Sequence, residues 1–468
     1  MNSPPFAAET LKPRLIAALS TCLPPAALLS DAEDLRPYEC DALVSHCALP
    51  LAVCLPTCES EVRDILRVCR QLKVPVVTRG AGTGLSGGAL PHAYGVVVSL
   101  TRMNRILRVD PANRLAVVQA GASNLAVSQA AAPHGLYFAP DPSSQAIATV
   151  GGNVAENAGG VHCVKYGMTV HHVLRLRALT SDGDTLDIGL EAPDSPGYDL
   201  LALLNGSEGT LAVVTEVTVR LLPRPEAAQV ALASFATLEA AGEAVAAIFA
   251  AGVVPSGLEL MDRATISAVS HFIDAGYDPH AAAVLLCELD GTPEEVAEEI
   301  ARVQEIMRTA GAIELRVSQS EAERQELWQG RKAAFPAVSS IEPDYYCLDG
   351  SLPRRHLGEM LASIRAMETE YGLATVNVFH AGDGNLHPLI LFDRSRPGDW
   401  EKAEAFGGAI LKKTVALGGA ITGEHGVGVE KLAYMAIQFS AQELDCLRRI
   451  RTAFDEVGLL NPGKAVPA

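Results

Sequence analysis

The spacing of apolar and polar positions divides the first half of the chain into helical and extended segments. Residues 59–72 carry Val62, Ile65, Leu66 and Cys69 at helical spacing, which predicts an amphipathic helix. A similar apolar spacing predicts a helix near the N-terminus, over residues 11–23. Short apolar runs predict buried strands at residues 51–56, 74–78, 95–100, 106–109, 115–119 and 173–179.

The pattern after residue 210 predicts a second domain. Residues 210–222 alternate between apolar and polar side chains up to Pro223, and the pair Pro223 and Pro225 predicts a boundary. Two helices and two strands are predicted beyond it, at residues 238–251, 294–310, 283–289 and 313–318. Since 468 residues exceed one ordinary core, we predict two domains. The strand–helix–strand opening followed by antiparallel-looking strands predicts an α+β protein. Its parts are a helical lead-in (1–45), a first domain (46–225), a sheet backed by helices (226–410) and a C-terminal segment (411–468).

Composition narrows the classes of partner and compartment. The sequence is 49% hydrophobic and 20% charged, with a formal net charge of -18; this charge disfavours nucleic acid and repels anionic membrane surfaces. No apolar run is long enough to cross a membrane, and the N-terminus lacks the layout of a signal peptide. The ten cysteines form no Cys-x-x-Cys pair, the usual mark of an iron–sulfur cluster or a zinc ribbon. Scattered cysteines are typical of reduced thiols, so we predict a cytoplasmic protein without a membrane span.

Glycine-rich segments indicate a site for a large cofactor in the first domain. Residues 79–88 (RGAGTGLSGG) follow a predicted strand and contain both Gly-x-Gly-x-x-Gly and, around Ser86, Gly-x-Ser-x-Gly. Neither a Rossmann site nor a nucleophile elbow is predicted, because both need a helix directly after the loop. Consecutive unhindered N–H groups can still form a nest for a pyrophosphate. Two more glycine-rich tracts, 140–160 and 206–210, predict further loops around the same cofactor.

Two short motifs in the second half supply candidate metal ligands. Residues 380–387 read HAGDGNLH, and residues 423–426 read GEHG. The imidazoles of His380 and His387 and the carboxylate of Glu424 suit a divalent cation with an open coordination position, acting as a Lewis acid. We expect zinc, although residue type leaves manganese and iron open. His425 is then a candidate base beside the metal-bound substrate.

These motifs resemble a known superfamily. Residues 75–91, 151–160 and 206–210 are similar to the FAD domain of the vanillyl-alcohol oxidase or p-cresol methylhydroxylase superfamily. Residues 330–335, 343–346, 379–392 and 423–426 resemble its D-2-hydroxyacid dehydrogenase branch, and within it the D-subunit family of glycolate oxidases. The resemblance implies an FAD-binding domain of two subdomains, a ferredoxin-like substrate cap, and a C-terminal segment that returns to the FAD domain.

The resemblance also assigns residues to the cofactor and the substrate. Those expected around the FAD pyrophosphate are Arg79, Gly80, Gly82, Thr83, Gly84, Leu85 and Ser86. Those expected along the isoalloxazine and ribityl parts are Pro140, Ser144, Gly151, Gly152, Asn157, Gly159, Gly160, Glu208 and Gly209, with Asn461 closing the site. We predict non-covalent FAD, because residues 79–88 contain no histidine or cysteine. Arg331 is expected to clamp the substrate carboxylate with its planar two-pronged guanidinium.

The activity implied is oxidation of a short 2-hydroxy acid, glycolate to glyoxylate or D-lactate to pyruvate. Hydride leaves Cα for flavin N5 while His425 takes the hydroxyl proton. Relatives that oxidise 2-hydroxyglutarate carry lysine and asparagine where this chain has Cys347 and Leu389, which disfavours a distal carboxylate. Because the chain has no cluster motif, we expect a second flavin subunit and an iron–sulfur subunit that deliver electrons to quinone at the inner membrane. Alternatives are a stand-alone D-lactate dehydrogenase, a non-catalytic flavin-binding subunit and a non-flavin metallohydrolase.

Overall fold

The computed structural model describes residues 5–192 and 196–467. The chain forms two compact units. Unit 1 comprises Met1–Gly159, Met168–Pro223 and His425–Ala468, and unit 2 comprises Gly160–Gly167 and Arg224–Glu424. Each unit is therefore assembled from segments that are distant in sequence.

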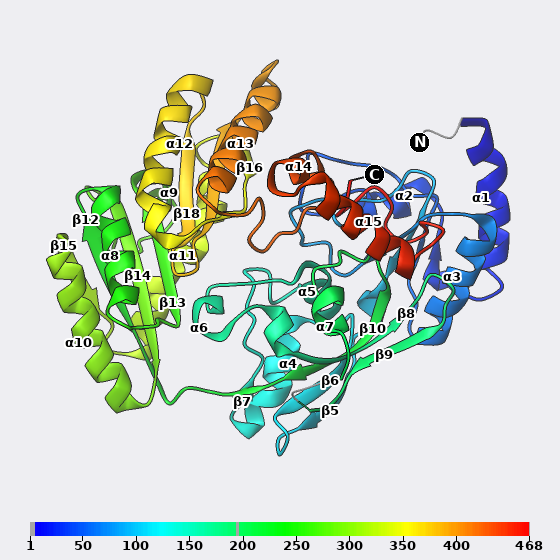
Figure 1. Ribbon diagram of the computed structural model, residues 1–468, viewed down its shortest axis with the longest axis horizontal. Helices are drawn as coiled ribbons and strands as arrows, with labels where there is room; N and C mark the ends of the chain where they lie inside the picture. Colours follow the sequence, from blue (N-terminus) through cyan, green and yellow to red (C-terminus); the bar gives the residue numbers. More distant parts are fainter. Residues whose placement is uncertain (1–4, 193–195, 468) are drawn as a thin grey trace. The chain divides into compact units, whose positions relative to one another are not determined.

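The first sheet of unit 1 has the strand order β1-β2-β4-β3. Helices α1 (Pro5–Leu19) and α3 (Glu59–Leu72) of the same unit lie side by side in Figure 1. Its strands are β1 (Leu28–Leu29), β2 (Ala52–Cys54), β4 (Val96–Ser99) and β3 (Val76–Arg79). Strands β2 and β3 both pair with β4 in parallel, and α3 (Glu59–Leu72) makes the crossover between them. The four apolar residues that predicted this helix are all buried, and α1 (Pro5–Leu19) packs beside it. Helical spacing therefore located α3 because one face of it covers the sheet.

The second sheet of unit 1 is antiparallel, with the order β5-β6-β10-β8-β9. Its strands are β5 (Ile106–Asp110), β6 (Leu115–Gln119), β10 (Val213–Arg220), β8 (Val173–Leu179) and β9 (Thr185–Gly189). A short pair, β7 (Leu136–Tyr137) and β11 (Leu222–Pro223), lies outside this sheet. The remaining helices of these segments are α2 (Ala32–Leu35), α4 (Asn124–Ala131), α5 (Val150–Glu156) and α7 (Leu200–Leu204). The two sheets give the two subdomains that the resemblance implied.

The second glycine-rich tract contains a helix where we expected only a loop. Thr149 caps α5 by accepting a hydrogen bond from the N–H of Gly152, at 3.1 Å. Gly151 lies so close to the residue that follows β6 that an added Cβ would be 2.7 Å from the Cβ of Ala120. The glycines are needed for close approach of the helix to the sheet, a requirement that the sequence pattern did not reveal.

Unit 2 contains one antiparallel sheet in the order β15-β12-β14-β13-β18-β19-β16, with β17 also paired to β19. Its strands are β12 (Ala227–Phe235), β13 (Gly257–Asp262), β14 (Ala283–Gly291), β15 (Ala312–Val317), β16 (Asp344–Cys347), β17 (Gly350–Ser351), β18 (Thr375–His380) and β19 (Asn385–Phe392). The first four strands follow the order 4-1-3-2 with α8 and α10 after the first and third. This is the ferredoxin-like arrangement that the resemblance implied.

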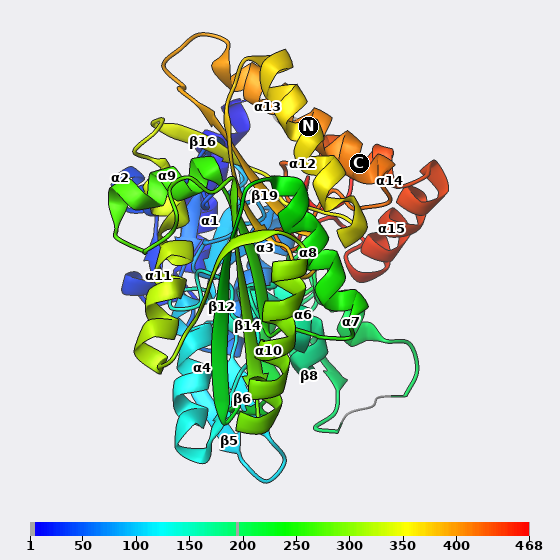
Figure 2. The same ribbon diagram turned by 90° about the vertical axis from the view of Figure 1, so that its left-hand side faces the viewer.

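Helices cover both faces of this sheet. One face carries α8 (Leu238–Ala250), α10 (Pro293–Thr309), α12 (Leu357–Tyr371) and α13 (Asp399–Ala416), over a large apolar core. The other face carries α9 (Arg263–Phe272) and α11 (Glu321–Val338), over a smaller one. Figure 2 shows α10 and α11 on opposite sides of β12 and β14. The segment 160–167, with α6 (Cys163–Tyr166), joins this unit because Lys165 and Tyr166 bind Asp290 of β14 at 2.5 and 2.7 Å.

The C-terminal segment completes unit 1, as the resemblance implied. It contains α14 (Met435–Gln438) and α15 (Ala441–Phe454). Beyond them, Leu460 bridges Val76 in parallel at the edge of the first sheet. Among the residues that the structure describes, no helix is both long enough and apolar enough to cross a membrane.

Candidate active site

The hairpin of β18 and β19 brings the two motif histidines to one face of the sheet in unit 2. His387 pairs with Val378, two residues before His380, so both imidazoles project to the same side. Their ring centroids are 5.1 Å apart. Gly384 permits the tight turn: its φ is +79°, and an added Cβ would lie 2.1 Å from the carbonyl oxygen of Leu352.

Glu424 brings the third predicted ligand to the histidines. Its Oε1 lies 3.1 Å from Nε2 of His387 and 3.4 Å from Nε2 of His380. One donor atom from each side chain falls within a group no wider than 4.8 Å. The three side chains are only 6%, 3% and 14% exposed. The structure therefore assembles two imidazole nitrogens and one carboxylate oxygen, a donor set that fits a divalent cation.

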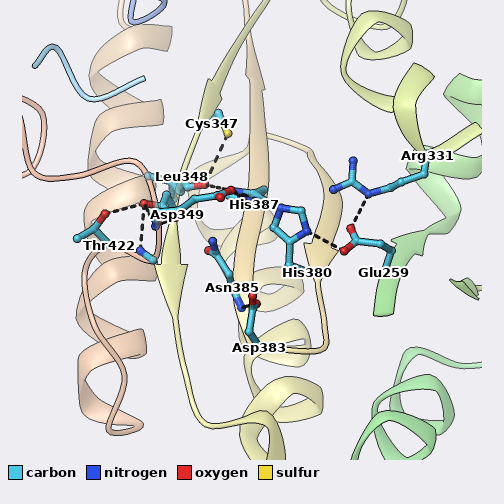
Figure 3. Close-up of polar contacts among 12 residues, drawn as sticks. Glu259, Arg331, Cys347, Leu348, Asp349, His380, Asp383, Asn385, His387 and Thr422 are labelled. Carbon is cyan, nitrogen blue, oxygen red and sulfur yellow. Dashed lines mark hydrogen bonds and ion pairs between the residues drawn. The ribbon is translucent and has the colours of Figure 1, made fainter. Parts of the chain in front are cut away.

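Hydrogen bonds to neighbouring groups orient the nitrogen and oxygen donor atoms of this triad toward one another. His380 Nδ1 lies 2.7 Å from Oε1 of Glu259, and His387 Nδ1 lies 3.1 Å from the carbonyl oxygen of Leu348 (Figure 3). Both acceptors require a proton on Nδ1, which makes Nε2 the nitrogen of each ring that can bind a metal. The Asp349 carboxylate accepts hydrogen bonds from the N–H groups of Gly423 and Glu424, at 3.0 and 3.1 Å, and so holds the loop that carries Glu424.

The electrostatics of the triad also favour a cation. Burial alone would lower the pKa of His380, but the carboxylates of Glu259 and Glu424 raise it well above its usual value. Burial is likewise outweighed at His387, where Cys347 and Glu424 raise the pKa to about 10. The pKa of Glu424 is lowered well below its usual value, because the two histidines overcome its burial. A potential that holds protons on two buried imidazoles would also stabilise a dication in their place.

Arg331 is buried in unit 2, where it points from α11 to the sheet. It is 4% exposed, and its Nε donates to Oε2 of Glu259 at 2.7 Å. Glu259 of β13 is fully buried, and it therefore contacts both a candidate metal ligand and the candidate substrate clamp. Sequence reasoning missed it. The one signal was an isolated carboxylate in the otherwise apolar run Gly257–Met261.

The first glycine-rich loop of unit 1 is built to receive an anionic group. The N–H groups of residues 82–85 donate to no residue within the described ranges. No atom lies within 4 Å of the position of a Cβ on Gly84, so the loop is open there. Arg79 is largely engaged elsewhere, since its Nη1 donates to the carbonyl oxygen of Cys40 at 2.7 Å. Backbone donors, more than the Arg79 charge, therefore make this loop suitable for an anionic group.

Comparison with known proteins identifies the family. The model of an FAD binding domain matches residues 50–189, and the model of the C-terminal domain of FAD linked oxidases matches residues 224–465. The chain belongs to the FAD-linked oxidases. It is 54% identical to glycolate oxidase subunit GlcD of Escherichia coli (strain K12), over 97% of this chain and 91% of the relative. It is 34% identical to a D-lactate dehydrogenase of Anaerostipes hadrus, over 89% of this chain and 90% of the relative.

A solved structure supports the fold of this FAD-linked oxidase. p-Cresol methylhydroxylase with substrate bound matches at a TM-score of 0.83, covering 98% of this chain and 97% of that chain, at 17% identity. The p-cresol methylhydroxylase type of fold predicted from the motifs is thus confirmed. The predicted likeness to the D subunits of glycolate oxidases is confirmed by the curated relatives.

The other residues expected at FAD lie mostly in unit 1 of this oxidase. Gly151 and Gly152 form the first turn of α5, and Asn157 follows it with a φ of 50°. Gly160 belongs to unit 2. Ser86 and Asn153 have buried polar atoms without a hydrogen-bond partner in the described chain, Oγ and Nδ2. Orphaned donors of this kind beside an open glycine loop fit a polar cofactor such as FAD.

Glu208, which is expected along the flavin, has both carboxylate oxygens engaged by the C-terminal segment. Its two carboxylate oxygens accept from the N–H groups of Val427 and Gly428, each at 2.7 Å. Its carbonyl oxygen accepts from Nδ2 of Asn461, which also donates to Gly88 at 2.9 Å. Glu208 therefore anchors the loop that follows His425 and does not present a free carboxylate.

Gly426, directly after His425, is required where this loop meets α5. Its φ is +85°, and an added Cβ would lie 2.3 Å from Oε2 of Glu156. His425 itself is the first residue of the C-terminal segment of unit 1. The sequence motif therefore marks a backbone constraint as well as candidate chemistry.

Proposed function

We propose that this FAD-linked oxidase oxidises a short 2-hydroxy acid, glycolate foremost, to the 2-oxo acid. The observation that carries the proposal is the convergence of His380, His387 and Glu424 within 4.8 Å, with Arg331 one carboxylate away. A cation site next to a guanidinium suits a substrate with a hydroxyl beside a carboxylate. The names of the curated relatives, a glycolate oxidase subunit and a D-lactate dehydrogenase, agree with this chemistry.

The proposed mechanism divides the work among the protein side chains. His380, His387 and Glu424 would hold a divalent cation, zinc in our proposal, which would supply Lewis acidity toward the substrate hydroxyl. Arg331 binds the substrate carboxylate through its terminal guanidinium nitrogens. His425, which directly follows Glu424 in the chain, accepts the hydroxyl proton at its imidazole. Bound FAD supplies the acceptor for the hydride that leaves Cα.

The proposed FAD site uses backbone more than charged side chains. Residues 82–85 offer N–H groups to the pyrophosphate, with Arg79, Gly80 and Ser86 at its edge. The sides of the flavin are assigned to Pro140, Ser144, Gly151, Gly152, Asn157, Gly159, Gly160 and Gly209. Glu208 and Asn461 hold the C-terminal segment against the glycine loop. We propose non-covalent attachment.

The proposed substrate is short because two positions of unit 2 lack polar groups. Cys347 and Leu389 pair directly across β16 and β19, and both are buried. A lysine and an asparagine at these positions would meet on one face of the sheet. With a thiol and an isobutyl group there, a second carboxylate would lose its partners.

A second candidate function, oxidation of D-lactate, is favoured by the relatives named D-lactate dehydrogenases. The test is an anaerobic titration of the yellow protein with glycolate, D-lactate and D-2-hydroxyglutarate, followed by flavin absorbance. We expect bleaching by glycolate, and removal of the metal with a chelator should abolish it. Bleaching by D-lactate alone would favour the second candidate. Preference for D-2-hydroxyglutarate, or a protein without bound flavin, would contradict the proposal.

We propose that the chain works as a subunit. The relatives at 54% and 37% identity are both named subunits of glycolate oxidase, and all ten cysteines of this chain are free thiols, dispersed through both units. Electrons would then leave FAD for a second flavin subunit and an iron–sulfur subunit on the way to quinone. We propose that the chain is cytoplasmic and that those partners place it at the inner membrane. Full quinone reductase activity of the purified single chain would contradict this.

A further inference from the structure

We propose that Glu259 is a positioning residue that joins the cation site to the substrate-carboxylate site. One of its carboxylate oxygens orients His380, and the other orients Arg331. The inference rests on the proposed function, since it assigns those two partners to cation and substrate.

Each carboxylate oxygen of Glu259 contacts a different side chain. Oε1 lies 2.7 Å from Nδ1 of His380, and Oε2 lies 2.7 Å from Nε of Arg331. Figure 3 shows the carboxylate between the two side chains. Glu259 is paired directly with His380 across β13 and β18, so the backbone sets this contact. Because the carboxylate is fully buried, water does not compete for either oxygen.

The contact with His380 determines which ring nitrogen faces the cation site. A carboxylate can only accept, so Nδ1 carries a proton, and Nε2, on the side of Glu424, is the ring nitrogen that can bind a cation. Such carboxylate–histidine contacts also fix the plane of the ring. Glu259 therefore sets both the tautomer and the direction of a candidate ligand.

The contact with Arg331 leaves the useful part of the guanidinium open. Only Nε is bound by Glu259, and neither terminal nitrogen donates to another residue in the described part of the chain. Arg331 is 4% exposed. Its two terminal guanidinium nitrogens are therefore nearly buried donors that an anionic group can satisfy. A substrate carboxylate satisfies both in one plane, as a bidentate acceptor.

The neighbouring strand offers a matched control. Glu288 of β14 is also buried, and it also binds one histidine, from the segment 160–167, and one arginine, from α11. Its oxygens lie 3.1 Å from Nε2 of His162 and 2.6 Å from Nη1 of Arg324, seven residues before Arg331. Loss of Glu288 removes the same types of contact from the same sheet and helix, but none of them involves the candidate site.

The experiment compares Glu259→Gln and Glu288→Gln in the full-length flavoprotein. A glutamine has one acceptor oxygen, so it can serve His380 or Arg331 but not both. We expect the Glu259 variant to bind zinc about tenfold or more weakly in chelator competition. With zinc saturating, its KM for glycolate should still rise about tenfold. The Glu288 variant should keep both constants within about twofold of the wild type.

Glu259→Asp serves if the glutamine variant does not fold, because it keeps the charge but is too short to span both partners. Zinc affinity equal to that of the Glu288 variant would overturn the proposal. So would a change in zinc affinity without a change in KM at saturating zinc, because the two sites would then be independent. The zinc competition needs no turnover. It therefore still tests the His380 arm if the proposed substrate is wrong.

Discussion

At the scale of single residues, the candidate site of unit 2 is a continuous chain of ionisable side chains. Arg331, Glu259, His380, Glu424 and His387 are linked in that order by contacts of 2.7 to 3.4 Å. Each buried charge has an opposite or titratable partner on at least one side. The attraction between these partners offsets the free energy that is needed to remove so many ionisable groups from water. Removal of one link is therefore expected to disturb its neighbours.

The first prediction at this scale concerns Asp349, which holds the loop of Glu424. In Asp349→Asn, an amide N–H would face one of the present donors, the Oγ1 of Thr422 or a loop N–H. We expect a loss of about 1–3 kcal/mol in the free energy of unfolding and weaker zinc binding. Denaturant unfolding and chelator competition measure the two effects. Asp262→Asn is the control, because Asp262 is a buried acceptor for Thr265 and Asn377; it should reduce stability only.

The second residue-scale prediction concerns pH. Burial raises the pKa of Glu288, but His162, Arg324 and Trp328 outweigh it, and the pKa is lowered from 4.5. A lowered pKa in the folded state gives stability that is present above the unfolded pKa and is lost as pH falls through the folded pKa. Glu288→Gln should therefore cost about 3 kcal/mol at pH 7, and this difference should shrink below about pH 4.5. Urea unfolding at several pH values is the measurement. A difference that stays constant down to pH 3.5 would refute the assignment.

At the scale of elements, two helix glycines on the same face of the cap sheet differ in their surroundings. A Cβ on Gly407 of α13 would lie 2.7 Å from the ring of Tyr346, which itself packs against Trp400. A Cβ on Gly242 of α8 would meet nothing closer than 3.6 Å. The first glycine is required for close packing of α13, whereas the second only lowers helix propensity.

Alanine substitutions should therefore have opposite signs. Gly407→Ala is expected to destabilise the protein by about 1–3 kcal/mol through overpacking. Gly242→Ala should stabilise it by about 0.5–1 kcal/mol, because alanine has the higher helix propensity. Thermal unfolding of both variants tests this pair. Equal shifts of the two would show that the packing at α13 is softer than the distances indicate.

At the scale of the whole molecule, the C-terminal segment is part of unit 1, which also contains the residues matched by the FAD binding domain. Nδ2 of Asn461 and Nζ of Lys464 both donate to the carbonyl oxygen of Gly88, at 2.9 and 3.0 Å, at the end of the glycine loop. The N–H of Asn461 also donates to Val76 at 2.7 Å, at the edge of the sheet. The last residues of the chain therefore stabilise a loop that lies almost four hundred positions earlier, since Asn461 and Gly88 are 373 residues apart.

Truncation tests this dependence. Deletion of residues 459–468 should release most of the bound FAD and lower the melting temperature, because the glycine loop loses its anchors and a bound cofactor no longer stabilises the fold. Deletion of residues 466–468 leaves Leu460, Asn461 and Lys464 in place and should retain the flavin. The ratio of flavin to protein absorbance measures both. Equal flavin content in the two deletions would contradict the anchoring role.

Periodicity in the sequence located some of the elements that have one buried face. Helix α3 has the predicted bounds, and α8 and α10 lie within one residue of theirs. Strand β13 and helix α9 were not predicted. All residues of β13 are buried. Its sequence therefore shows neither the two-residue alternation of a half-buried strand nor the 3.6-residue spacing of an amphipathic helix. Helix α5 was missed because its glycines are needed for packing, not for a flexible loop.

The sequence by itself determined the family, the FAD domain, and the motif residues that carry candidate chemistry, because these are local patterns of residue types. Only the tertiary structure revealed Glu259, the use of Glu208 as an anchor, and the burial of Arg331. Glu259 and His380 are 121 positions apart, and Glu208 and Val427 are 219 apart. Contacts of this range depend on strand pairing and on where a returning segment docks. No local pattern of residues encodes them.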